Sequence, residues 1–141
     1  MSFQIFVIIP QAAIPMPSNS HTWEKWARES SKVILFEETL GSDATVYTYW
    51  SSLAEQLGLP LLASVYTRGL HLDAIQDFHT LATELDILES YWQVHLLDEQ
   101  AGQDAEAIDL LETLKGRLSH FRRAIQLASE KRAILFVEQP P

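Results

Sequence analysis

The chain has 141 residues, of which 47% are hydrophobic and 21% charged, and its net charge is −9. This length is typical of a single domain, so residues 1–141 are expected to form one globular unit with its own core. The absence of cysteine excludes disulfides and thiolate metal sites, and the negative charge disfavours binding to nucleic acid or to anionic membranes.

The first elements are predicted from two apolar runs. Phe3–Ile9 is almost continuously apolar, which predicts an interior strand covered on both faces. No basic residue precedes this run, and it is too short to cross a bilayer, so we expect neither a signal peptide nor a membrane span, and a cytoplasmic location. A short helix is expected over Trp23–Ser30, and a second strand over Lys32–Glu37.

A helix is predicted over Asp43–Leu57, with Ser42 as its N-cap and Gly58 at its C-terminal cap. On such a helix, Tyr47 falls at the edge of the buried stripe and is expected to be exposed. The alternation of Thr, Val and Tyr over Thr45–Tyr49 is also compatible with a strand, so this segment has two interpretations.

Leu61–Tyr66 is predicted to be a third strand, because a short apolar run follows Pro60. Arg68 and Gly69 are then expected to form a turn. If Lys32–Glu37, the following helix and Leu61–Tyr66 form a right-handed βαβ unit, the two strands are parallel.

Two long amphipathic helices are predicted next, joined by a loop at Gln100–Gln103 that makes them antiparallel neighbours. Their apolar stripes are Ile75, Phe78, Ala82, Leu85, Leu88 and Trp92 in the first, and Ile108, Leu111, Leu114 (or Leu110), Leu118, Phe121, Ile125 and Ala128 in the second. Ala133–Val137 is expected to form a closing strand. The order β-β-α-β-α-α-β predicts an α/β or α+β fold, with a small mixed sheet of about four strands and three helices.

The charge distribution is the main functional signal. Gly69–Leu114 contains eleven Asp and Glu but no Lys or Arg. In the last helix, acids in the first half and bases in the second half complement the helix dipole, so they need no partner. The basic end of that helix is expected beside Asp73 and Asp77, which leaves a negative pole on the preceding helix and the loop after it. Its residues are Glu84, Asp86, Glu89, Asp98 and Glu99.

These five acids are interpreted as a docking surface for a basic protein partner, in a non-enzymatic protein of the inhibitor or immunity type. The alternative is a solvated face that serves solubility. A second hypothesis is a small-molecule-binding protein or enzyme with a pocket at the strand ends, drawing on Glu37, Glu38, Asp43 and Tyr66. A third is a homodimer that associates through exposed aromatic residues.

No catalytic, cofactor or metal motif is recognised. The chain has no G-x-S-x-G elbow and no glycine-rich phosphate loop. The densest set of metal-ligand residue types is His71, Asp73, Asp77 and His79, but its spacing does not converge on one ion along a helix. His95 and Glu99 have suitable spacing but make only two ligands. We therefore expect no metal and no cofactor.

Overall fold

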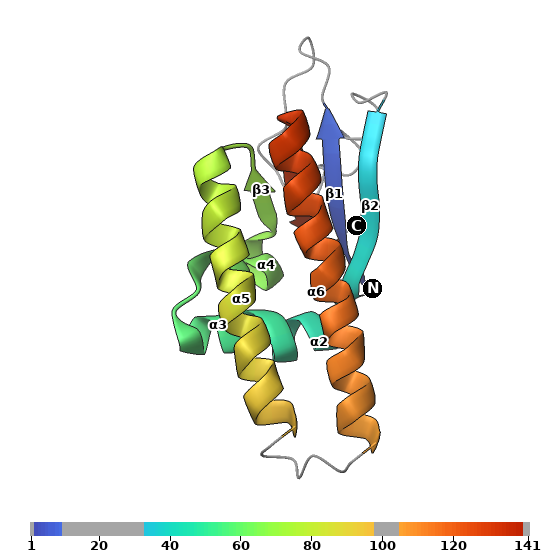
Figure 1. Ribbon diagram of the computed structural model, residues 1–141, viewed down its shortest axis with the longest axis vertical. Coiled ribbons are helices and arrows are strands. Elements are labelled where there is room, and N and C mark those ends of the chain that lie inside the picture. Colours follow the sequence, from blue (N-terminus) through green and yellow to red (C-terminus); the bar gives the residue numbers. More distant parts are fainter. Residues whose placement is uncertain (1, 10–32, 98–104, 140–141) are drawn as a thin grey trace.

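The computed structural model of the protein describes residues 2–9, 33–97 and 105–139 (Figure 1). The expected helix Trp23–Ser30 and loop Gln100–Gln103 lie outside these ranges. Within them, four antiparallel strands form one sheet of order β2-β1-β4-β3, packed against helices, which confirms an α+β fold. The strands are β1 (Ser2–Ile9), β2 (Val33–Ser42), β3 (Leu70–Leu72) and β4 (Ile134–Glu138).

Strand β1 lies inside the sheet, between β2 and β4. Val7 is the register partner of Phe36 on one side and of Leu135 on the other. The four consecutive residues Ile5, Phe6, Val7 and Ile8 are all 0% exposed. Because neighbouring residues of a strand point to opposite faces, both faces of β1 are buried, as its continuous apolar run predicts.

The segment after β2 is helical, which settles the choice between helix and strand there. It consists of α2 (Asp43–Thr45), the π-helical turn η2 (Val46–Ser51) and α3 (Ser52–Leu57). The Ser42 side chain accepts a hydrogen bond from the Thr45 N–H, so it is the predicted N-cap. Gly58 has φ 72° and ends the segment in the left-handed conformation that glycine adopts readily.

The prediction of a strand at Leu61–Tyr66 is wrong, because Pro60–Arg68 forms helix α4. The third strand is instead the short β3, which directly follows the expected turn at Gly69. β3 pairs with β4 in antiparallel orientation, so the expected parallel βαβ unit is absent from the described sheet. The described ranges hold four helical segments, one more than predicted.

Helices α5 (Ile75–Leu97) and α6 (Ala105–Lys131) lie side by side and antiparallel over one face of the sheet (Figure 1). The predicted stripe of α6 is buried from Leu111 to Ala128, but its first member, Ile108, is 38% exposed. On α5, Ile75 is 58% exposed and Leu81, at 0%, takes the buried place expected for Ala82. No helix in the described ranges combines the length and the apolar composition that a bilayer crossing requires.

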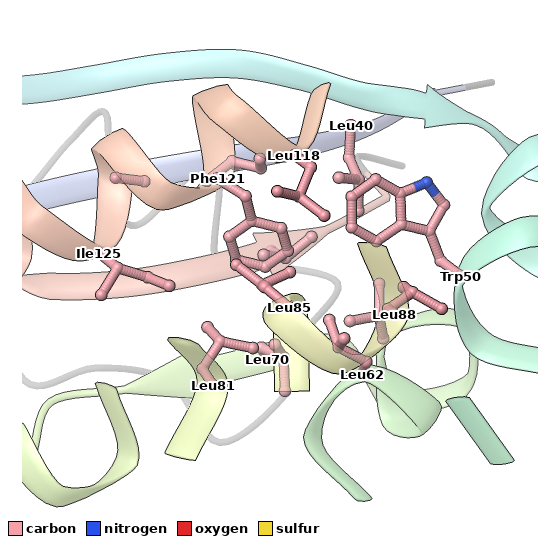
Figure 2. Packing of buried hydrophobic residues seen from close by; sticks show 14 of the residues in the cluster. Leu40, Trp50, Leu62, Leu70, Leu81, Leu85, Leu88, Leu118, Phe121 and Ile125 are labelled. Carbon is pink, nitrogen blue, oxygen red and sulfur yellow. The ribbon is translucent and has the colours of Figure 1, made fainter. Parts of the chain in front are cut away.

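The core lies between the helices and the sheet (Figure 2). Trp50 of η2 occupies its centre and packs edge-on against Trp92 of α5, with ring centroids 4.9 Å apart. The ring of Phe121 on α6 lies 6.0 Å from Trp50 on another side. These large side chains join the π-helical turn to both long helices, so the position of η2 is fixed by core packing.

Candidate functional site

Glu84 belongs to the interior and not to a docking surface. Its side chain is 3% exposed, and its two carboxylate oxygens accept hydrogen bonds from the N–H groups of Leu61 and Leu62, at 3.2 and 2.9 Å. These are among the first N–H groups of α4, whose N-cap residue Leu59 has no side chain able to accept them. The carboxylate of α5 therefore caps α4, and the prediction that Glu84 faces a partner is wrong.

Burial acts on the charge of this carboxylate. Desolvation raises the pKa of Glu84 above its usual value, and the hydrogen bonds from Leu62 and Leu61 oppose that rise. Capping of α4 accounts for the burial of this carboxylate, so its burial does not point to a bound substrate.

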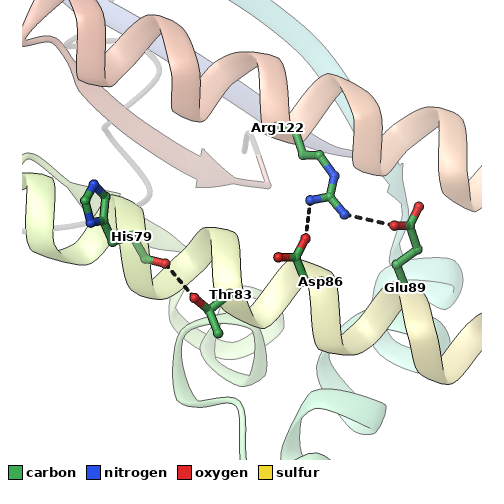
Figure 3. Close-up of polar contacts among 5 residues, drawn as sticks. All are labelled: His79, Thr83, Asp86, Glu89 and Arg122. Carbon is green, nitrogen blue, oxygen red and sulfur yellow. Dashed lines mark hydrogen bonds and ion pairs between the residues drawn. The ribbon is translucent and has the colours of Figure 1, made fainter.

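Asp86 and Glu89 are bound by one arginine of the neighbouring helix (Figure 3). The Arg122 guanidinium donates to Asp86 at 2.6 Å and to Glu89 at 2.9 Å. Burial by itself lowers the pKa of Arg122. The hydrogen bonds and negative charges of Asp86 and Glu89 raise this pKa by more than burial lowers it, so the net shift is upward. We call this three-residue group the Arg122 clamp.

The clamp corrects the predicted register of the two helices. Lys115 donates to Gln93 at 3.4 Å, seven residues from the Arg122–Asp86 contact along both helices. The basic half of α6 therefore lies beside the middle of α5, and not only beside Asp73 and Asp77 at its start. Asp86 and Glu89 were expected to face the acidic start of α6, and they instead contact Arg122 in its second half. Asp98 and Glu99 lie outside the described residues.

Three further exposed acids lie in the first half of α6. Glu106, Asp109 and Glu112 are exposed and lie three residues apart, which places them along one side of the helix. We call these three residues the acidic α6 surface. They stabilise the N-terminal half of α6 through its dipole, and no described contact places Asp109 or Glu112 in an ion pair.

Two exposed tyrosines form the clearest aromatic feature of the surface. Tyr47 of η2 is 55% exposed, as predicted, and Tyr66 of α4 is 39% exposed. Their ring centroids lie 5.1 Å apart, and Tyr66 also contacts Phe3 of β1 at 5.9 Å. The contact between η2 and α4 brings together residues that are distant in the sequence.

The residues predicted to line a pocket at the strand ends are spread over three elements. Glu37 and Glu38 lie within β2, opposite Phe6 and Ile5, and point to opposite faces of the sheet. Asp43 begins α2 and accepts a hydrogen bond from the side chain of Gln139. With Tyr66 on α4, none of the four lines any of the three cavities described next.

The cavities lined by described residues include three of similar volume. The side pocket, about 370 Å³, lies between α5 and α6 and is lined by Glu89, Ser90, Gln93, Val94 and Lys115. The end pocket, about 310 Å³, lies where α5 starts and α6 ends, and is lined by Asp73, Ile75, Phe78, Ala128, Ser129 and Arg132. The turn pocket, about 320 Å³, is lined by Glu55, Gly58, Leu59, Pro60 and Ala63.

Within the described ranges, no three His, Cys, Asp or Glu side chains are grouped so that they could hold a metal ion. His71 lies on β3, before α5, while Asp77 and His79 lie on the helix itself. His95 stacks on Tyr91, with ring centroids 4.0 Å apart.

Arg122 and Arg132 are the residues whose roles the sequence reasoning missed. Arg122 binds Asp86 and Glu89 of α5, and Arg132 lines the end pocket. Only the register of two antiparallel helices distinguishes these roles.

No protein-family model matches the chain, and neither the curated proteins nor the solved structures contain a significant match.

Proposed function

We propose that this protein is a non-enzymatic, cytoplasmic binding protein that presents an acidic helical surface to a basic protein partner. The observation that carries the proposal is the uneven use of acids on the helix pair. Glu84 caps α4 and Asp86 and Glu89 bind Arg122, whereas the acidic α6 surface is exposed. The docking surface is therefore assigned to the start of α6 and not to the middle of α5.

The chemistry of this surface suits a partner rich in Lys and Arg. Three carboxylates on one side of a helix create a local negative field, within a chain of net charge −9. Ile108 is 38% exposed on the same half of the helix and offers apolar area beside the charges. Such a combination favours fast, salt-sensitive association with a basic surface.

The test is affinity capture from the host, followed by binding measurements on the captured protein. The double variant D109N/E112Q should weaken binding about tenfold, since each rim charge contributes up to about 1 kcal/mol. The control variant E55Q/E130Q makes the same change in net charge on α3 and in the last turn of α6, away from the acidic α6 surface, and should leave affinity unchanged.

Salt provides a second readout. Affinity should fall steeply between about 50 and about 300 mM salt, because exposed charges are screened over about 8–10 Å near physiological ionic strength. An acidic captured partner, or equal effects of the two double variants, would contradict the proposal.

The Tyr47–Tyr66 pair favours a second function, association of two copies of the chain. Tyrosine is enriched where protein surfaces meet, and two neighbouring rings at 55% and 39% exposure are available here. Light scattering at two concentrations should then show a dimer that Y47S/Y66S abolishes. A monomer at both concentrations would remove this alternative.

A further inference from the structure

The end pocket is formed by the two ends of the helix pair that lie together at the sheet. Asp73 lies two residues before the start of α5, and Arg132 directly follows the last residue of α6. The antiparallel packing of the helices brings these two residues to one cavity of about 310 Å³. This volume is at the lower end of the range for ligand pockets, roughly 300–1,000 Å³.

Two opposite charges line this cavity without neutralising each other. Within the described ranges, no ion pair joins Asp73 to Arg132, and no hydrogen bond holds either side chain. His71 lies two residues before Asp73. Burial lowers the pKa of His71, and the charge of Asp73 opposes this shift.

Each charge has a local reason to be where it is. An acid at the start of α5 and a base at the end of α6 complement the helix dipoles. Arg132 also has φ 51°, a conformation uncommon for a residue other than glycine, and it directs the chain from α6 into β4. Helix dipoles explain the sign of each charge, but they do not explain why the two charges line one cavity without an ion pair between them.

The remaining lining supplies an apolar wall and a hydroxyl group. Phe78 is buried at 2% exposure, while Ile75 is 58% exposed and forms the rim. Ser129 contributes the hydroxyl from the last turn of α6. The pocket thus combines an anion, a cation, a hydrogen-bonding group and an apolar surface within the reach of one small molecule.

We propose that the end pocket binds a small zwitterion of the α-amino-acid type, with its ammonium group at Asp73 and its carboxylate at Arg132. An aliphatic side chain of the ligand lies against Phe78 and Ile75. This site lies at the opposite end of the helix pair from the acidic α6 surface, and so it goes beyond the proposed partner binding.

The other two cavities lack this combination. In the side pocket, Glu89 is bound by Arg122 and Lys115 donates to Gln93, so the charges have protein partners. The lining of the turn pocket includes one acid, Glu55, and no base. The side pocket is larger, yet among these three only the end pocket is lined by an acid and a base that form no ion pair within the described residues.

The test is an NMR titration of the full chain with L-leucine, N-acetyl-L-leucine and L-leucinamide. The amide signals of Phe78 and Ser129 should shift with L-leucine. Each blocked analogue lacks one charge and should bind at least about tenfold more weakly, because a charge-assisted hydrogen bond is lost.

Two variants assign the ends of the ligand. D73N should weaken L-leucine about tenfold but leave N-acetyl-L-leucine unchanged, since that ligand has no ammonium group. R132N should weaken L-leucine but leave L-leucinamide unchanged, and asparagine tolerates the left-handed backbone of this position. K115Q, in the side pocket, is the matched control and should bind L-leucine like the parent protein.

The expected pattern links each variant to one end of the ligand. No shift with L-leucine at about 20 mM, where a ligand of millimolar affinity saturates, would overturn the proposal. So would equal affinities for the three compounds, or an effect of K115Q as large as that of D73N.

Discussion

The Glu84 carboxylate accepts a hydrogen bond of 2.9 Å from the backbone N–H of Leu62, which lies 22 residues earlier in the chain. A second one, of 3.2 Å, comes from Leu61. A helix normally receives this contact from its own N-cap side chain. Here the N-cap is Leu59, and the following residue, Pro60, has no N–H, so an acid of α5 supplies both acceptors. The start of α4 and the middle of α5 are thereby joined.

Replacing Glu84 with alanine should reduce the free energy of unfolding by about 1–3 kcal/mol, because partly buried N–H groups of α4 lose their acceptor. Urea denaturation at neutral pH measures the change. Glu84→Gln keeps one side-chain oxygen and should cost less. Glu55→Ala removes an exposed acid and is the control. Equal effects of E84A and E55A would contradict the capping role.

The pH dependence of stability should also report on Glu84. Its pKa is raised in the folded state, so the folded protein holds this proton more tightly than the unfolded chain does. The resulting stabilisation is complete below the unfolded pKa, near 4.5, and is lost as the pH rises through the folded pKa. The parent protein should thus lose stability relative to E84Q as the pH rises above about 4.5, as measured by paired urea titrations. A gain over this range would show that the hydrogen bonds outweigh desolvation.

Removing the Arg122 clamp should have a moderate effect. Arg122→Gln breaks contacts with two carboxylates, and we expect a loss of about 1 kcal/mol, since the side chains are partly exposed and screened by solvent. The loss should shrink in high salt. Arg123→Gln is the matched control, because Arg123 is exposed and its bond is to Gln126 of the same helix. Thermal unfolding at two salt concentrations checks both points.

The two central tryptophans should respond differently to replacement by phenylalanine. The indole N–H of Trp92 donates to the Tyr49 carbonyl at 2.9 Å, whereas that of Trp50 is buried without a described partner. Both changes remove similar ring volume. Trp92→Phe also removes a hydrogen bond, and should therefore cost about 1 kcal/mol more than Trp50→Phe. Chemical denaturation of the two variants gives the difference, and a larger cost for W50F would refute the argument.

Ser51 links η2 to α4 through a single buried hydroxyl. Its Oγ donates to the Leu62 carbonyl at 2.9 Å and accepts from the Tyr66 N–H at 3.1 Å. Ser51→Ala should cost about 1–3 kcal/mol, because a buried carbonyl and an N–H group both lose a partner. Ser52→Ala, one residue later and partly exposed, should change stability by less than about 0.5 kcal/mol. Equal values would mean that α4 does not depend on this hydroxyl.

The elements predicted correctly are those that are specified by a pattern within their own sequence and not by contacts with other elements. The continuous apolar run of β1, the three-and-four spacing of α6 and the capping residues Ser42 and Gly58 all act locally. Helix α4 was missed because its acceptors come from Glu84, in another helix. A short apolar run such as Leu61–Tyr66 does not distinguish strand from buried helix by periodicity.

The candidate sites likewise separate into features visible in the local sequence and features that depend on how the helices pack. The sequence shows that acids outnumber bases between Gly69 and Leu114, but the pairing of Arg122 with Asp86 depends on how α5 and α6 align. The end pocket depends on the same alignment, because Asp73 and Arg132 belong to opposite ends of the helix pair. The tyrosine at position 47 was predicted to be exposed from helix geometry alone, while its neighbour Tyr66 required the position of α4.

The pairing of Val7 with Leu135 has a consequence for the order of folding. The inner strand β1 ends at Ile9, whereas its partner β4 begins only at Ile134 and is therefore synthesised much later. At roughly 5–20 residues per second, β1 waits on the order of 10 s on the ribosome before β4 exists. During that time it can pair with β2, but one edge and much of its apolar surface lack their native cover. The nascent chain is therefore most prone to aggregate before its last strand emerges, and the sheet is completed only after synthesis has passed Leu135.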